Sequence, residues 1–300
     1  MFVKAERKKA KLRLGLDGPS GSGKSMGALL IAKGIGGKVA AIDTEEGSLS
    51  LYSDLLDFDV SELRPPFTPE SYVKRIHEAE AAGYDIIIID SASHEWMGQG
   101  GVLDIHDNMP GNSYTNWAKV NPRHNEFIEA ILRSKCHIIC TLRSKQKHEM
   151  VEVNGKKEVK KLGMGAQQRE GVEYELTTVL SLDSGRANGS KDRTKLFRDG
   201  DWFVITEDTG KMILDWLNSG KEEPLPFAPD ELAGILAGAN SVDDLGALYK
   251  SAEFQGRMKA SDVAVVNGAV AARKAALVER ERATHIDEIT ADAIEESRNG

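Results

Sequence analysis

Apolar runs separated by polar turns occupy much of residues 12–142 and predict strands that alternate with helices. Residues 12–17 alternate between apolar and polar positions, as a strand does, whereas 26–33 carry an apolar stripe at helical spacing. Two later runs, 39–42 and 84–91, are short and strongly apolar, and the second contains four consecutive isoleucines. Strands buried on both faces are typical of parallel sheets that are covered by helices. We therefore expect an α/β fold with a mostly parallel central sheet.

Turn and capping residues set further boundaries. Thr68 and Pro69 predict the start of a helix over about 70–82, after a polar connection at 54–67. Residues 97–116 are rich in Gly and Asn and predict a long, functional loop. A helix over 117–134 and a strand over 136–142 follow.

The middle of the chain predicts antiparallel strands. Val151–Val153 and Glu158–Lys160 flank Asn154-Gly155, the commonest signal for a two-residue hairpin turn. Residues 172–182 predict another strand and 183–192 a polar turn. Two closing antiparallel strands are expected at 193–197 and 202–205.

A proline-rich segment separates this core from a helical region. We expect a core over 1–218 with a basic arm at 1–11, a linker over 219–229, helices at 230–238, 241–251 and 261–282, and a disordered acidic tail at 283–300. Ser241 and Ser261 are the expected helix caps.

Net charge, the lengths of the apolar runs and the two cysteines limit the kinds of partner and compartment that the sequence allows. The net charge of −8 argues against a protein that is basic over its whole surface, so a nucleic-acid site must be a local patch. No apolar run is long enough to span a membrane, and residues 1–13 lack the apolar stretch of a secretory signal. Cys136 and Cys140 lie in a strand-like run and are expected to be buried thiols in a reducing compartment, the cytoplasm.

The segment Gly18-Pro-Ser-Gly-Ser-Gly-Lys24-Ser25 matches the phosphate-binding P-loop, between a strand and a helix as the motif requires. Its glycines let the backbone approach phosphate, Lys24 would reach the β- and γ-phosphates, and Ser25 would bind Mg²⁺. The expected ATP-binding residues here are Gly18, Pro19, Ser20, Gly21, Ser22, Gly23, Lys24 and Ser25, together with Met26, which follows the motif.

Polar residues at strand ends supply the remaining chemistry. Asp90 closes the isoleucine strand in the Walker B pattern and would hold Mg²⁺. Glu45 follows the strand 39–42 and would activate the attacking water, with Glu46 and Glu95 as open alternatives. Thr141 ends the strand 136–142 and would sense the γ-phosphate.

Residues 143–169 hold eight basic residues against three acidic ones, a local excess in an acidic chain. This segment is our candidate for a phosphate-backbone site, and the alternative is a solvated hairpin. Tyr114 or Trp117 would have to supply base stacking. The nucleic-acid candidates are Lys145, Lys147, Lys156, Lys157, Lys160 and Lys161.

In this order, the motifs at 18–25, 43–45, 90–91 and 141 resemble the RecA-like ATPases, over about residues 12–206. The core looks like phage-encoded nucleotide-binding proteins labelled as AAA-domain proteins, some of which are recombinases that anneal single strands. The resemblance implies that Glu45 is the catalytic carboxylate and that 97–116 and 143–169 are DNA-binding loops. The residue that senses γ-phosphate in that family is usually Gln, where this chain has Thr141.

These features lead to the hypothesis of an Mg-ATP-hydrolysing protein that assembles into a ring or filament and binds or anneals single-stranded DNA in the cytoplasm of a bacterial host. Arg193, or Lys195, would then reach the nucleotide of an adjacent subunit. One alternative is a replication, packaging or helicase-loading motor. Another is a nucleotide-dependent switch whose protein partner binds the C-terminal helices.

Overall fold

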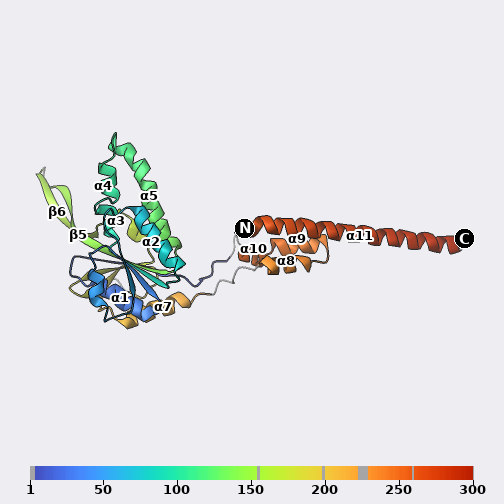
Figure 1. Cartoon of the computed structure of the whole chain (residues 1–300), viewed down its shortest axis with the longest axis horizontal. Coiled ribbons are helices and arrows are strands. Elements are labelled where there is room, and N and C mark those ends of the chain that lie inside the picture. Colours follow the sequence, from blue (N-terminus) through green and yellow to red (C-terminus); the bar gives the residue numbers. More distant parts are fainter. Residues whose placement is uncertain (1–3, 154–155, 198–199, 222–228, 259, 300) are drawn as a thin grey trace. The chain divides into compact units, whose positions relative to one another are not determined.

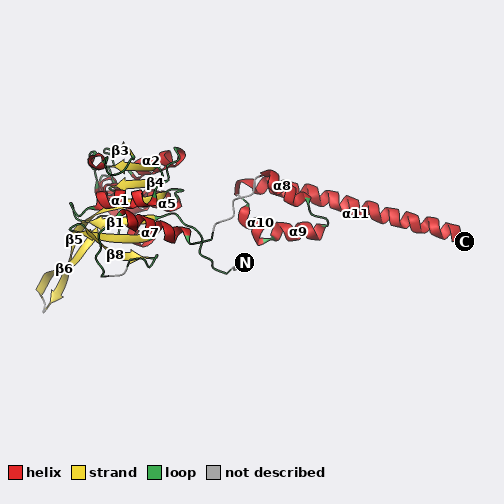
Figure 2. Cartoon of the chain, turned by 90° about the horizontal axis from the view of Figure 1, so that it is seen from below, coloured by secondary structure: helices red, strands yellow, loops and turns green. Residues whose placement is uncertain are grey.

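The computed structural model describes residues 4–153, 156–197, 200–221, 229–258 and 260–299. Only the backbone is described for 146–153, 156–164, 229–230, 252–253, 256, 260, 287–288 and 290–299. The chain divides into two compact units, Met1–Lys221 and Glu222–Gly300, which are described separately below. Figure 1 shows the elements of each unit, and Figure 2 gives a second view coloured by secondary structure. In the described part of the chain, no helix is both long and apolar enough to cross a membrane.

The first unit is built on a mostly parallel sheet, which confirms the predicted fold class. The strand order is β3-β2-β4-β5-β1-β7-β8, and only β8 runs antiparallel to its neighbour in that order. The strands are β1 (Arg13–Gly18), β2 (Val39–Asp43), β3 (Asp59–Glu62), β4 (Ile86–Asp90), β5 (His137–Val153), β6 (Lys156–Ala166), β7 (Thr178–Asp183) and β8 (Arg186–Asp192).

Helices cover both faces of this sheet. Helices α1 (Lys24–Ile35) and α7 (Glu207–Asn218) lie on one face, and α2 (Pro69–Ala81) and α5 (Ser113–Arg133) lie on the other (Figure 1). The four consecutive isoleucines of β4 alternate between the two cores, because successive side chains of a strand point to opposite faces. All four are fully buried, as the unbroken apolar run predicted.

The segment 97–116 is more ordered than the predicted loop. Helix α3 (Ser93–Met97) precedes it, α4 (Val102–Asp107) lies within it, and α5 already begins at Ser113. Asn112 caps α5 by accepting a hydrogen bond from the backbone N–H of Tyr114 at 2.8 Å. Val102 and His106, one helical turn apart, are buried, and this anchoring explains why the glycine-rich segment forms a helix.

Several predicted boundaries between 54 and 205 were wrong. β3 lies inside the predicted polar connection, and 172–182 divides into α6 (Val172–Glu175) and β7. The predicted turn at 183–192 contains β8, whereas 193–197 and 202–205 form no strand beyond a bridge between Ala187 and Phe203. The Asp192 carboxylate accepts hydrogen bonds from the backbone N–H groups of Thr194 at 2.7 Å and Phe197 at 2.8 Å, which curls this segment.

Strands β5 and β6 form an antiparallel ribbon that leaves the core (Figures 1 and 2). Val153 pairs with Lys156, and the predicted turn at Asn154-Gly155 lies outside the described residues. Because β5 is 17 residues long, a single strand belongs to the sheet at its start and to the ribbon at its end.

The second unit consists of α8 (Pro229–Ala237), α9 (Val242–Lys250), α10 (Ala252–Arg257), a 3₁₀ turn (Ala260–Asp262) and α11 (Val263–Asn299). It has its own apolar core, which includes Leu232, Leu236, Leu245, Phe254 and Val266. Ser241 caps α9, as predicted, by accepting a hydrogen bond from the backbone N–H of Asp244 at 3.1 Å. Ser261, the other predicted cap, lies in the 3₁₀ turn.

Two features of this unit differ from the prediction. Helix α10 was missed, and α11 continues to Asn299 through the tail expected to be disordered. The tail contains Ala and Glu residues, which favour helix. Extending a helix that has already formed costs less free energy than starting a new one, so α11 continues into the tail.

Residues 4–11 of the basic arm are exposed, and the arm also contacts the end of α7. The Arg7 guanidinium lies 4.1 Å from the ring centroid of Trp216 on α7, and Arg7 also donates to the Trp216 carbonyl and the Ser219 hydroxyl. The backbone N–H of Lys9 donates to the carbonyl of Lys221 at 2.9 Å. The arm therefore closes against the end of α7.

Candidate nucleotide-binding site

The glycine-rich loop lies between the end of β1 and the start of α1, as its motif requires. Gly21 and Gly23 have φ angles of 77° and 95°, which side-chain-bearing residues rarely adopt. A Cβ atom on Gly18 would lie 2.5 Å from both the Leu182 carbonyl oxygen and Ser22 Oγ. The backbone N–H groups at the start of α1 supply positive potential for an anion at this loop.

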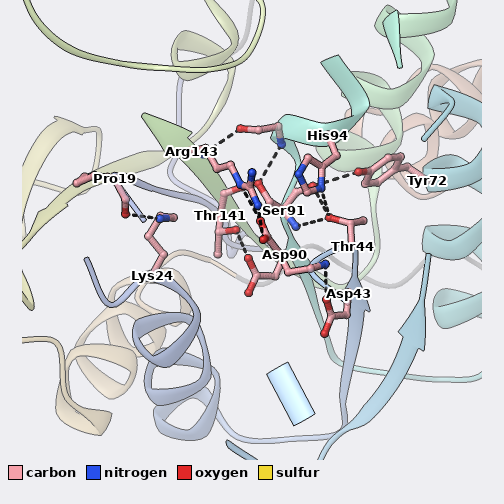
Figure 3. Close-up of polar contacts among 12 residues, drawn as sticks. Pro19, Lys24, Asp43, Thr44, Tyr72, Asp90, Ser91, His94, Thr141 and Arg143 are labelled. Carbon is pink, nitrogen blue, oxygen red and sulfur yellow. Dashed lines mark hydrogen bonds and ion pairs between the residues drawn. The ribbon is translucent and has the colours of Figure 1, made fainter. Parts of the chain in front are cut away.

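Lys24 is folded over the loop. Its Nζ donates a hydrogen bond to the Pro19 carbonyl at 2.7 Å (Figure 3), and the residue is only 9% exposed. Burial lowers the pKa of Lys24, while the Asp90 and Glu45 carboxylates act in the opposite direction. The ammonium is therefore held close to both acidic strand ends, where it can meet phosphate charge.

Asp90 presents an unpaired oxygen to this site. Its Oδ1 accepts a hydrogen bond from the Thr141 hydroxyl, whereas Oδ2 is buried and has no hydrogen-bond partner among the described residues. Burial raises the pKa of Asp90, and the nearby Ser25 and Thr141 hydroxyls oppose that shift. Buried polar atoms normally have partners, so the unpaired oxygen beside Ser25 fits a magnesium ion that both residues would hold.

Ser22, on the glycine-rich loop, also has a buried oxygen without a hydrogen-bond partner among the described residues. The residue is 2% exposed. A phosphate oxygen is a suitable partner for a hydroxyl at this position. The loop and the acidic strand end therefore both leave unsatisfied groups where a Mg-nucleotide would supply partners.

Thr141 acts on Asp90 in this structure. It is fully buried, and its hydroxyl is committed to the Asp90 carboxylate, which lies on the neighbouring strand β4 (Figure 3). The contact orients Asp90 and leaves its second oxygen free.

The three candidate carboxylates have different surroundings. Glu45 is partly exposed and forms a two-pronged ion pair with Arg143, in which Arg143 Nε lies 2.9 Å from Oε1. Glu46 is exposed. Glu95 is fully buried, 3.0 Å from His124 Nδ1 and 3.3 Å from Gln168 Nε2, and burial raises its pKa. Glu45 alone combines solvent access with a place beside Lys24 and Asp90, and this favours it among the three.

Arg143 is the functional residue that the sequence analysis missed. It was counted only in the charge of the basic segment, yet it lies on β5 opposite Gly18 of the P-loop. Its backbone N–H also donates to Ser93 Oγ at 2.9 Å, just beyond Asp90. Its position at the end of a central parallel strand, where ligands bind in α/β folds, was the available signal.

A polar network fixes the turns that carry these groups (Figure 3). Asp43 Oδ1 accepts from the Glu45 N–H at 2.6 Å and so holds the loop that presents Glu45. Thr44 Oγ1 accepts from the Ser91 N–H at 2.8 Å and lies 2.8 Å from His94 Nδ1. Burial and the charge of Arg143 lower the pKa of His94, which keeps its ring neutral near pH 7.

Other predicted site residues lie elsewhere. Arg193 directly follows the edge strand β8, at the end of the strands away from the P-loop, and its Nη2 donates to the Tyr174 carbonyl at 2.8 Å. Lys195 is exposed in the same segment. Neither residue belongs to the nucleotide site of its own chain, so a role for either one requires a neighbouring subunit.

The predicted nucleic-acid residues divide into two sets. Lys145 is exposed on β5, whereas the side chains of Lys147, Lys156, Lys157, Lys160 and Lys161 lie outside the described residues. Tyr114 is 87% exposed. The Trp117 ring stacks on His106 at 4.1 Å and on Trp96 at 5.9 Å between centroids, so it already has aromatic partners. Tyr114 is the better candidate for base stacking.

Cys136 and Cys140 are buried free thiols, as predicted. Burial raises the pKa of both, to about 12 for Cys140. They take no part in the nucleotide site.

Comparison with known proteins agrees with this geometry. A family model described as an AAA domain matches residues 10–211, which is well over half of the chain and includes the P-loop, Glu45, Asp90 and Arg143. No curated protein matches the chain. The chain therefore belongs to the AAA-domain family of P-loop nucleotide-binding proteins.

Proposed function

We propose that this protein hydrolyses Mg-ATP and couples hydrolysis to the binding of single-stranded DNA. The observation that carries the ATPase assignment is the buried, unpaired Oδ2 of Asp90 beside Ser25 and the P-loop. This arrangement supplies an oxygen ligand for a hard cation next to a phosphate cradle.

Each residue has a distinct role in this reaction. Magnesium, when bound, would neutralise phosphate charge between Ser25 and Asp90. Lys24 would exchange its contact with the Pro19 carbonyl for phosphate oxygens and stabilise the charge that develops there. Glu45 would orient the attacking water and accept its proton, and Arg143 fixes the direction of that carboxylate.

The ribbon supports the proposed DNA site. Strand β5 carries Arg143 at the nucleotide site and then continues directly into the ribbon. Residues 143–169 hold eight basic residues against three acidic ones, in a chain of net charge −8. A basic two-stranded ribbon is suited to contact a phosphate backbone without reading its sequence. We propose that DNA binds along the ribbon, with Tyr114 available for stacking.

Assembly and annealing extend this proposal. A ring or filament would bring Arg193 or Lys195 of one chain to the nucleotide of the next, because both follow the edge strand β8 at the end of the strands away from their own P-loop. Pairing of complementary strands, as in phage-type recombination, would follow from several chains holding one strand.

A second candidate is a nucleotide-dependent switch for a protein partner. The C-terminal helices favour it, because they form a separate unit with its own apolar core. A replication or packaging motor would use the same ATPase site and DNA contact.

The test is ATP hydrolysis by the full chain with and without a single-stranded oligonucleotide, at low and moderate salt. We expect DNA to stimulate hydrolysis and the stimulation to fall with salt, because phosphate contacts release counterions. Complementary labelled oligonucleotides then test annealing, and strand displacement tests the motor. Hydrolysis that DNA does not change at either salt concentration would refute the DNA proposal and favour the switch.

A further inference from the structure

Both strands of the ribbon are attached to the short segment that follows Asp90. Where β5 enters the ribbon, the Thr141 carbonyl accepts from the Ala92 N–H at 3.0 Å, and the Arg143 N–H donates to Ser93 Oγ at 2.9 Å. Where β6 leaves the ribbon, Gln168 Nε2 donates to the Ala92 carbonyl at 3.0 Å. The segment 91–95 therefore contacts both strands at the base of the ribbon.

Gln168 is held in one orientation by its surroundings. It is 9% exposed, and its Oε1 accepts from the Arg169 N–H at 2.8 Å. Its Nε2 also lies 3.3 Å from Glu95 Oε2, and the other oxygen of Glu95 lies 3.0 Å from His124 Nδ1 on α5. A buried polar cluster of this kind depends strongly on geometry, so a small shift of one member disturbs the others.

We propose that Gln168 is a positioning residue that couples occupancy of the ribbon to the nucleotide site. This inference rests on the proposed function and adds the route of its regulation. Asp90 and the segment 91–95 are continuous in the chain, so a Mg-nucleotide at Asp90 sets the position of Ala92 and Glu95. Gln168 transmits that position to the end of β6, while β5 contacts the same segment separately, through the Arg143 N–H. Nucleic acid bound to the ribbon shifts the end of β6, and the same contacts of Gln168 transmit that shift back to the segment 91–95 and Asp90.

The test measures this coupling in both directions on the full chain. Anisotropy of a labelled oligothymidine gives the DNA Kd with and without a slowly hydrolysed Mg-ATP analogue, and a fluorescent analogue gives the nucleotide Kd with and without DNA. The two ratios must agree, because coupling between binding sites is reciprocal. For the wild-type chain we expect a ratio of about fivefold or more, within the usual range for coupled sites.

Gln168→Leu removes both hydrogen bonds of Nε2 at nearly constant size, and Gln168→Glu keeps the length and the acceptor for Arg169. We expect both variants to keep basal ATP hydrolysis and salt-sensitive DNA binding, while the coupling ratio falls to within about twofold of one. The matched control is Gln167→Leu, which changes the neighbouring half-buried glutamine and should keep the wild-type ratio.

Each outcome has a defined meaning. A wild-type ratio in both Gln168 variants overturns the role of Gln168 and leaves the proposed function intact. Variants that lose basal hydrolysis together with thermal stability identify Gln168 as a structural residue and also overturn the inference. A wild-type chain that shows no ATP hydrolysis or no DNA binding refutes the proposed function itself, before any variant is compared.

Discussion

The Glu45–Arg143 pair gives the sharpest prediction about the chemistry. The two side chains are 24% and 41% exposed, respectively, so their ion pair contributes no more than about 1 kcal/mol to stability. Arg143→Ala should therefore leave the unfolding temperature nearly unchanged. Its effect should appear in catalysis, because the two-pronged contact fixes the direction of the carboxylate that orients water.

The magnitude follows from the role of a general base. Loss of Glu45 itself, as in Glu45→Gln, should lower kcat by about 10²–10⁴-fold. Arg143→Ala leaves the base in place but mobile, so we expect a smaller loss of about 10-fold to 100-fold, with little change in KM. Arg143→Lys should restore only part of the rate, because an ammonium cannot make both contacts at once.

Steady-state phosphate release measures these values, and a double-mutant cycle tests the reasoning. If Arg143 acts through Glu45, Arg143→Ala should cost almost nothing further in the Glu45→Gln background. Equal losses from Arg143→Ala in both backgrounds would refute this mechanism and indicate a direct contact between Arg143 and phosphate. A kcat within about twofold of wild type for Arg143→Ala alone would refute any catalytic role.

Three further predictions concern the P-loop and its metal ligand. Asp90→Asn should abolish Mg-dependent nucleotide binding in calorimetry yet raise the melting temperature of the nucleotide-free chain, since it removes a buried charge worth about 1–3 kcal/mol. Burial raises the pKa of Asp90, so the stability of the wild-type chain falls as the pH rises from the ordinary Asp range through that raised value. The stability gained by Asp90→Asn should therefore grow from pH 4 to pH 7. A gain that stays constant over this range would contradict the assignment. Gly18→Ala should lose ATP binding, because the new Cβ meets the Leu182 carbonyl oxygen; retained affinity in a filter-binding assay would contradict the loop geometry.

Elements that are determined by a few neighbouring residues in the sequence were predicted correctly. The isoleucine run of β4 and the glycine-rich loop combine a distinctive pattern with a neighbouring strand or helix, so few alternative structures fit them. Thr68 and Pro69 begin α2 as expected, because capping depends on a few adjacent residues.

Elements that depend on distant contacts were missed. The sequence of β8 is polar and contains glycine, so it predicted a turn. In the structure Gly189 leaves space for Phe197, because a Cβ atom on residue 189 would lie only 2.9 Å from Phe197 Cβ. Arg143 and Glu45 are far apart in the sequence and meet only because β5 and β2 flank β4 in the sheet. Register and strand order decide both cases, and neither is encoded in a local pattern.

The most direct test of the central claim is phosphate release from ATP by the full chain in Mg²⁺, compared with the Lys24→Ala variant. Lys24 carries the only positive side chain of the P-loop motif and lies beside both acidic strand ends. We predict Mg-dependent turnover by the wild-type chain and none above background by a folded Lys24→Ala chain. Equal turnover by the two proteins, or wild-type turnover that does not require Mg²⁺, would contradict this prediction.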